Sequence, residues 1–320
     1  MSKKWGSFIG VYFCSLLLTA CNKTLLNKHS LPMSLTFFNL AIVSIVLVGW
    51  KAFFLRRTRL RVLPYRSASR QESLAISTLI LLAACTAADV GMSAFAISRL
   101  PLSAVTVVKS GGVVLTFFWG VGLGIEKFSW KMLSVCFFIF STVACALPWK
   151  EEKLDAHGIF FLFFSVFFAS LRWVLIQKEL ISLTPLDLLV KTQPLSALFI
   201  LPLAVSEGYK SIDITQDIDA FALCILMAAP IFAFGLMYCE FIVVEKTSSL
   251  TLYVSGILRE LTTLLMSVFM FNEELSSRQT IAISASICGL FLYAKLRNQS
   301  SNPKIRGYVR DLQDITAIRE

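Results

Sequence analysis

Two cations inside long apolar stretches are the residues of this sequence best suited to bind an anion. Lys109 lies within Leu102–Trp130, which is long enough to span a bilayer, and is followed by Ser110 and two glycines. Arg259 lies within a second apolar stretch, residues 248–271. A charge at membrane depth costs about 2.5–3.5 kcal/mol on insertion scales and is rarely kept without a function. Arginine offers a bidentate fork and lysine a point charge, so the pair predicts a site for an anion.

The elements that hold these cations must be membrane helices. Of the 320 residues, 56% are hydrophobic and only 16% are charged, which excludes an ordinary soluble domain. A spanning helix needs about 20 apolar residues, so ten spans fit the chain. We expect them at residues 5–27, 32–54, 73–97, 101–124, 130–148, 157–177, 186–206, 220–243, 248–271 and 279–296.

Few residues could support other chemistry. The eight cysteines fall inside apolar spans without CxxC spacing, and only two histidines occur. The sequence therefore predicts no disulfide framework, no metal site, no cofactor and no nucleic-acid partner. A membrane enzyme is disfavoured because no acid pair or histidine cluster can be placed at one site.

Lysines and arginines of the loops are concentrated on one side of these spans, most densely in the loop of residues 55–71. The positive-inside rule makes that side cytosolic and predicts that both termini are cytosolic. The arginine-rich loop is a topology signal in this interpretation, with dedicated lipid binding as the alternative. Residues 297–320 form a basic tail, free or on the membrane surface.

The sequence contains a weak internal repeat. A shift of 147 positions brings Glu126-Lys-Phe-Ser129 onto Glu273-Glu-Leu-Ser276. At nearly the same offset three charged pairs align: Lys23 with Arg172, Lys109 with Arg259, and Asp89 with Glu240. Five spans separate the copies, and an odd number implies inverted halves, as in many secondary transporters. The expected parts are a first repeat (1–147), a lumenal linker (148–156), a second repeat (157–296) and a cytosolic tail (297–320).

The order of several short motifs resembles one transporter family. They are Asn22-Lys23, Asp89-Val-Gly91-x-Ser93, Lys109-Ser110, Glu126-Lys127-Phe128-Ser129, Arg172-x-Val-Leu-x-Gln177-Lys178, Thr247-Ser248-x-x-Thr251, Gly256-x-x-Arg259-Glu260 and Gly289…Tyr293-x-Lys295. Over residues 5–297 this order is similar to the drug/metabolite transporter superfamily, in its nucleotide-sugar and triose-phosphate translocator group (solute carrier family 35-like). Glu260 after Arg259, where plastid translocators carry two adjacent basic residues, is more similar to the nucleotide-sugar side and its GDP-fucose carrier branch. Lys191 departs from the pattern without an explanation.

The resemblance implies an all-α membrane protein with ten transmembrane helices in two inverted five-helix repeats, and antiport of a phosphorylated solute. We expect exchange of cytosolic nucleotide sugar for lumenal nucleoside monophosphate across the Golgi or ER membrane, by alternating access and without enzymatic activity. The alternatives are a sugar-phosphate or phosphoenolpyruvate/phosphate antiporter, and a scaffold that has lost transport. The base, the sugar and the oligomeric state stay open.

Candidate residues divide into two groups. The substrate-binding candidates are Lys109, Arg259, Arg172, Lys23, Ser110 and Tyr253, and the gating or charge-pairing candidates are Asp89, Glu240 and Glu260. The alternative for Lys109 and Arg259 is an internal salt bridge to Glu260 or Asp89. Lys23 and Arg172 lie near span ends, where snorkelling to the interface is equally compatible with the sequence.

The two glycines after Ser110 and one further lysine can be interpreted in structural terms. The glycines at 111 and 112 allow either a kink beside the substrate or close helix packing. Lys51, at the end of an expected span, is interpreted as a snorkelling anchor.

Overall fold

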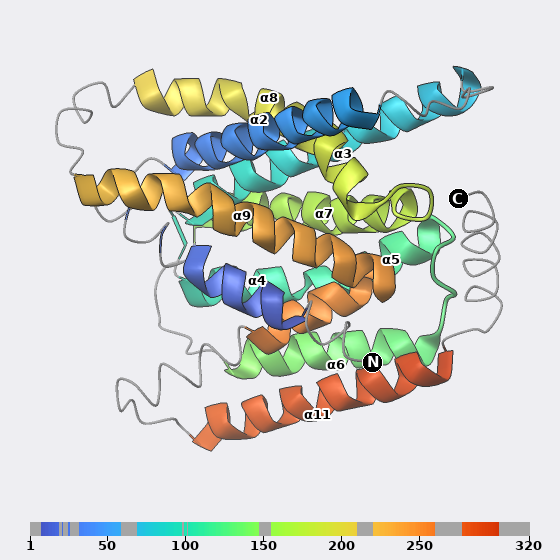
Figure 1. The fold of residues 1–320 in the computed structure, drawn as a ribbon. Helices are drawn as coiled ribbons and strands as arrows, with labels where there is room; N and C mark the ends of the chain where they lie inside the picture. Colours follow the sequence, from blue (N-terminus) through green and yellow to red (C-terminus); the bar gives the residue numbers. More distant parts are fainter. Residues whose placement is uncertain are drawn as a thin grey trace. The chain divides into compact units, whose positions relative to one another are not determined.

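Every regular element that the computed structural model describes is a helix (Figure 1). The described residues are 8–18, 21, 25, 32–58, 69–97, 99–100, 102–146, 155–209, 220–259 and 277–300. Within them, five helices are long and apolar enough to cross a bilayer. These candidate spans are Met33–Phe53, Ile76–Ser93, Ala156–Glu179, Pro185–Glu207 and Cys224–Lys246.

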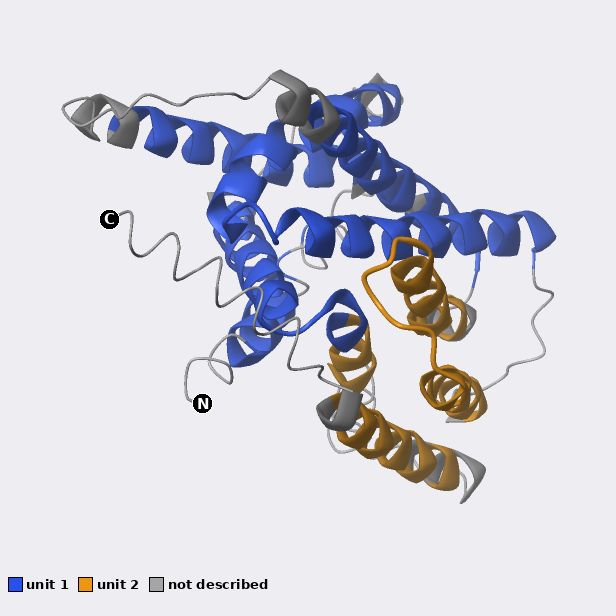
Figure 2. Cartoon of the chain, turned by 90° about the vertical axis from the view of Figure 1, so that its right-hand side faces the viewer, with its two compact units in different colours: residues 1–101, 153–252 blue, residues 102–152, 253–320 orange. Residues whose placement is uncertain are grey.

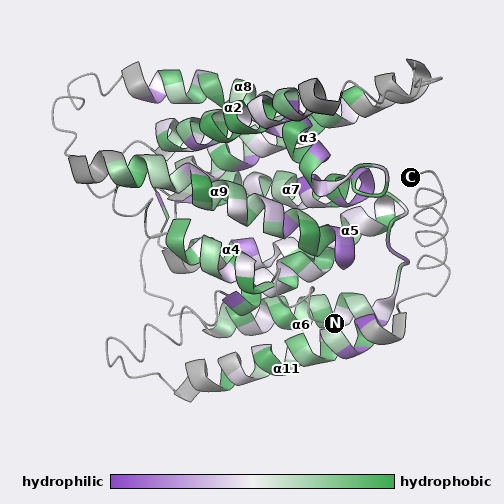
Figure 3. Ribbon diagram, in the orientation of Figure 1, coloured by the Kyte–Doolittle hydropathy of each residue, from purple (hydrophilic) through white to green (hydrophobic). Residues whose placement is uncertain are grey.

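Apolar residues occur on all sides of these helices (Figure 3). Large side chains such as Ile45 and Ile231 are 72% and 68% exposed. Such exposure is unfavourable in water but favourable in lipid, and a helix that is apolar all round is typical of a membrane span. The described part of the chain is therefore all-helical and of the multi-pass membrane type.

The helices form two compact units, of which the larger holds Met1–Pro101 and Lys153–Leu252 (blue in Figure 2). Its helices are Phe8–Leu18, α2 (Pro32–Thr58), α3 (Ser69–Ile97), α7 (Ala156–Glu179), α8 (Pro185–Tyr209) and α9 (Ala220–Lys246). In this unit α2 packs along α8, and α3 packs along both α7 and α8. Leu40, Ala87, Ala197 and Ile200 form a buried cluster where α2, α3 and α8 meet.

The smaller unit holds Leu102–Glu152 and Tyr253–Glu320 (orange in Figure 2). Its helices are α4 (Leu102–Ser110), α5 (Gly112–Gly122), α6 (Trp130–Ala146) and α11 (Ser277–Ser300). Here α11 packs closely along α6. At Gly289 of α11 the space is so narrow that an added Cβ would lie only 2.9 Å from Cγ1 of Ile139 on α6. A further helix, residues 249–259, begins in the larger unit and ends in the smaller one.

The described helices overlap the spans expected from the sequence, with bounds that mostly differ by a few residues. Two differences bear on the site. The expected span 101–124 is divided at Gly111, where α4 ends and α5 begins. The last helix, α11, continues to Ser300, so residues 297–300, which the sequence assigns to the tail, are helical. Residues 301–320 and the second part of the expected span 248–271 lie outside the described residues.

Local sequence explains where two of the helices begin. Asp155 caps α7, because its carboxylate accepts a hydrogen bond from the backbone N–H of His157. Thr184 and Asp187 cap α8 reciprocally: the Asp187 N–H donates to the Thr184 hydroxyl, which donates to the Asp187 carboxylate. Pro185 occupies the first position of α8, where a missing N–H costs nothing.

Candidate functional site

Lys109 lies in the last turn of α4 and is half-buried. A positive charge there is favoured by the dipole of the helix. Among the residues that the structure describes, no carboxylate or carbonyl accepts a hydrogen bond from its ammonium. A half-buried cation that finds no counter-charge among the described residues is the electrostatic arrangement expected of a site that takes up an anion.

The helix is interrupted at Gly111, two residues after Lys109. The Gly111 N–H donates to the carbonyl of Val108 at 3.1 Å, a tighter turn than that of an α-helix. A Cβ at Gly111 would lie 3.1 Å from the Val108 oxygen and 3.4 Å from a ring carbon of Phe140 on α6. Gly111 therefore lies where the helix is interrupted and also where it packs closely on α6.

Ser110, beside this break, is buried and its hydroxyl donates to the carbonyl of Val107 at 2.7 Å. The hydroxyl proton is therefore used within its own helix, while the oxygen keeps acceptor capacity. Contact of Ser110 with an anion would need this hydroxyl to rotate away from Val107.

Arg172 on α7 is held by the larger unit itself. Its Nη2 donates to Oδ2 of Asp89 on α3 at 3.2 Å, and Ser165 donates to Oδ1 of the same carboxylate at 2.8 Å. The guanidinium also lies over the Trp173 ring, 4.9 Å from its centroid. The Arg172 and Asp89 side chains are only 22% and 17% exposed. In the structure Asp89 is therefore the ion-pair partner of Arg172. The Arg172 side chain points to this carboxylate on α3 and does not extend freely to the membrane interface.

The remaining candidate residues divide by whether the structure describes them. Glu240 on α9 and Tyr253 and Arg259 on the helix 249–259 are half-buried. Each of these three takes part in at least one hydrogen bond, ion pair, ring contact or other electrostatic interaction. Lys23 and Glu260 lie outside the described residues.

Two other lysines have definite surroundings. Lys51, interpreted as a snorkelling anchor, lies 3.4 Å from a carboxylate oxygen of Asp187 on α8, with both side chains well exposed. Lys191 is exposed on α8. Among the described residues, no group of three or more histidine, cysteine and acidic side chains could hold a metal ion, and all eight cysteines are free.

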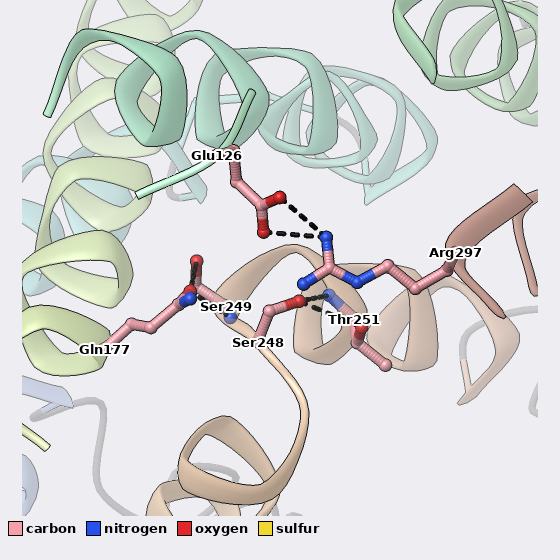
Figure 4. Close-up of polar contacts among 6 residues, drawn as sticks. All are labelled: Glu126, Gln177, Ser248, Ser249, Thr251 and Arg297. Carbon is pink, nitrogen blue, oxygen red and sulfur yellow. Dashed lines mark hydrogen bonds and ion pairs between the residues drawn. The ribbon is translucent and has the colours of Figure 1, made fainter. Parts of the chain in front are cut away.

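An ion pair that the sequence did not predict joins the loop before α6 to the end of α11 (Figure 4). Nη1 of Arg297 donates to both carboxylate oxygens of Glu126, at 2.8 and 2.7 Å. The loop reaches this position because Gly124 adopts a φ of 71° and the Glu126 N–H returns to the carbonyl of Gly120. Glu126 belonged to a quoted motif, but its partner had been assigned to the tail.

A second contact missed by the sequence analysis involves Gln177, near the end of α7. Its side-chain oxygen accepts hydrogen bonds from the N–H and the hydroxyl of Ser249, at 2.8 and 2.7 Å (Figure 4). Next to it Ser248 accepts a hydrogen bond from the Thr251 N–H, as a helix N-cap does. All of these residues except Ser249 had been noted in motifs, and Gln177 and Thr251 lie 74 positions apart in the sequence.

Comparison with known proteins places the chain among transporters. The model of the Triose-phosphate Transporter family matches residues 4–294. An Arabidopsis thaliana protein named as a probable sugar phosphate/phosphate translocator, At1g06470, is 22% identical over 88% of this chain and 70% of its own. YMD8 of Saccharomyces cerevisiae, named as a suspected nucleotide-sugar transporter, is 22% identical over 87% of this chain and 81% of its own.

A solved structure shares the fold. It is a crystal structure that covers 94% of this chain and all of its own, with a TM-score of 0.64 and 12% sequence identity. At this identity the likeness concerns the arrangement of the helices alone.

Proposed function

Because the chain belongs to the triose-phosphate transporter family, we propose that it is an antiporter of phosphorylated solutes, with nucleotide sugars as its substrates. Cytosolic nucleotide sugar would be exchanged for lumenal nucleoside monophosphate. The observation that carries the proposal is Lys109, a half-buried ammonium with no partner among the described residues, at the break of a membrane helix. The phosphate groups shared by both solutes supply the missing counter-charge.

The proposed site joins Lys109 with Arg259, as the aligned positions of the repeat suggest. Lys109 neutralises the phosphate as a point charge and Arg259 as a bidentate fork, with Ser110 and Tyr253 as polar neighbours. Arg172 enters the site less directly in this proposal, because Asp89 already holds it. By their place in the sequence, Lys23 is assigned to substrate binding, and Glu240 and Glu260 to charge pairing around the site.

Alternating access would follow from ten spans in two inverted five-helix halves, residues 1–147 and 157–296. The composition of the two compact units supports this: the larger contains the first three expected spans of each half and the smaller the last two. Within the units, α2 packs on α8 and α6 on α11, and each pair consists of equivalent spans of the two halves. Such pairing is expected when a twofold axis in the membrane plane relates the repeats.

The excess of lysine and arginine in alternate loops supports cytosolic termini. We assign the protein to the Golgi or ER membrane, where nucleotide sugars are consumed on the lumenal side. A sugar-phosphate/phosphate exchanger is the second candidate, and the similarity to the Arabidopsis thaliana protein favours it as much as the yeast relative favours the first.

Purified protein in liposomes tests both candidates. Vesicles are loaded with GMP, UMP, CMP or inorganic phosphate, and uptake of labelled nucleotide sugars or sugar phosphates is measured. Exchange of one nucleotide sugar for its own monophosphate, lost in Lys109→Ala and Arg259→Ala, is the expected result. Exchange only with inorganic phosphate would establish the second candidate, and no exchange with any phosphorylated solute would favour a scaffold.

A further inference from the structure

The hydrogen bonds of Gln177 determine which end of its side-chain amide faces Ser249. A backbone N–H can only donate, so the atom that faces the Ser249 N–H has to be the amide oxygen. The same oxygen accepts the Ser249 hydroxyl. Gln177 therefore serves as a double acceptor for the first residue of the helix 249–259.

The start of this helix is shielded from water. Ser248 and Ser249 are fully buried, at 0% and 3% exposed. The first N–H groups of a helix have no partner within it, and leaving such a donor buried and unpaired is costly. The Ser248 hydroxyl accepts from Thr251, and Gln177 accepts from Ser249. The two acceptors together determine where the helix starts.

Gln177 is itself held on a braced helix. Arg172 and Ser165 on α7 bind Asp89 of α3, and Glu179 accepts a hydrogen bond from Thr78 of α3 at 3.0 Å. Gln177 lies between Arg172 and Glu179 in the sequence of α7. The acceptor for Ser249 is therefore part of a rigid pair of helices rather than of a loop.

The helix that starts at Ser249 carries two residues of the proposed transport site. Tyr253 follows Ser249 by about one turn, and Arg259 follows it by ten residues, about 15 Å along the axis. A small tilt of the first turn is therefore magnified at the guanidinium. A displacement of about 1 Å at a binding group can reduce turnover about 100-fold.

We infer that Gln177 is a positioning residue of the transport site, which sets the direction of the helix that presents Tyr253 and Arg259. The inference rests on the proposed function, because it assumes that Arg259 contacts the phosphate. Gln177 itself touches no substrate in this account. Its effect is on the affinity for the phosphorylated solute rather than on the presence of a folded protein.

The test compares Gln177→Met with Gln177→Glu in the liposome exchange assay. Methionine keeps the volume but removes the acceptor, and the KM for the phosphorylated solute is expected to rise about 10-fold or more. Glutamate keeps the accepting oxygens and is expected to restore the KM to within a factor of about two of the parent. Gln193→Met is the matched control, since Gln193 is buried and its side-chain oxygen has no partner among the described residues.

Ser249→Pro gives a second route that leaves the amide in place. Proline is tolerated at the first helical position and lacks the N–H, so the helix remains while the contact with Gln177 is lost. The same rise in KM is expected. If Gln177→Met does not fold, this variant alone tests the positioning role of Gln177. In an Arg259→Lys background, Gln177→Met should add little, because both changes act through the same contact.

The outcomes separate this inference from the proposed function. If Arg259→Ala leaves exchange unchanged, the proposed site is wrong, whatever Gln177 does. If Arg259→Ala abolishes exchange while Gln177→Met and Ser249→Pro both keep the parental KM, the site stands and the positioning role of Gln177 is overturned.

Discussion

Arg172 and Lys109 both place a positive charge inside an apolar helix, but their surroundings differ. Arg172 has a carboxylate at 3.2 Å and an aromatic ring beneath its guanidinium, and its carboxylate partner is held by a serine. Lys109 has no such partner among the described residues. The two residues carry the same formal charge, yet of the two only Arg172 has a balancing carboxylate within the described part of the chain.

This difference separates structural from functional charges. A charge that the protein compensates contributes to the fold, and removing one partner leaves the other uncompensated. A charge that the protein leaves uncompensated lowers stability and is kept only for what it binds. Variants of the two residues should therefore affect different measurements.

The largest effect is expected from Lys109→Met on transport. Loss of a charge-assisted contact worth about 1.5–3 kcal/mol lowers exchange about 10- to 100-fold. The unfolding temperature in detergent should stay equal or rise, because an uncompensated charge has been removed. A clear fall in the unfolding temperature would contradict the comparison, since it would reveal a protein partner for Lys109.

Arg172→Met is the matched change at the compensated cation, and its main effect should be on stability. The variant leaves Asp89 with Ser165 as its remaining contact, and we expect a loss of about 2–3 kcal/mol in the free energy of unfolding. Adding Asp89→Asn should restore much of that loss, because the amide needs no counter-charge. Thermal unfolding in detergent measures both. If the single variant is as stable as the parent, the Asp89–Arg172 pair does not brace α3 and α7.

A smaller effect on stability is expected from the other ion pair, Glu126–Arg297. Its side chains are only 17% and 26% exposed, but it lies in a loop and near a helix end, where an unpaired charge can turn towards water. Arg297→Met should cost about 1–2 kcal/mol and leave the KM for substrate unchanged. The control is Lys127→Met, because Lys127 is exposed and directly follows Glu126 in the sequence. It should change the free energy of unfolding by less than about 0.5 kcal/mol. Equal losses in both variants would mean that the pair contributes nothing specific.

The sequence predicted the helices and the buried charges better than it predicted their partners. Hydropathy is a local property, so the apolar spans and the unusual position of Lys109 could be identified from neighbouring residues. The partner of Asp89 could not, because Asp89 and Arg172 are 83 positions apart and meet only when α3 packs on α7. Sequence alone left Asp89 as a possible partner of Lys109.

The same limit applies to the residues that the sequence analysis missed. Arg297 looked like the first residue of a basic tail, because its role depends on α11 lying along α6. Gln177 stood in a motif without a role, because the need for an acceptor arises only from burial of the turn that begins with Ser249. In each case packing between distant helices, rather than local pattern, gives the side chain its function.

The smallest effect is expected from Asp155, a charge outside the membrane spans. The pKa of its carboxyl is lowered, first by the hydrogen bond from the His157 N–H and then by Arg99, which approaches within 3.3 Å. A lowered folded-state pKa means that the carboxylate stabilises the cap of α7 above its ordinary pKa of about 4. That contribution is lost as the pH falls through the lowered value.

Asp155→Asn tests this, because asparagine also caps helices but does not titrate. At pH 7 the variant should unfold at a slightly lower temperature than the parent, because asparagine lacks the charge that the His157 N–H and Arg99 stabilise. Between about pH 5 and pH 3 the parent should lose stability more steeply than the variant, and the two unfolding curves should converge. Parallel curves over that range would show that the charge of Asp155, unlike the geometry of its cap, has no part in holding α7.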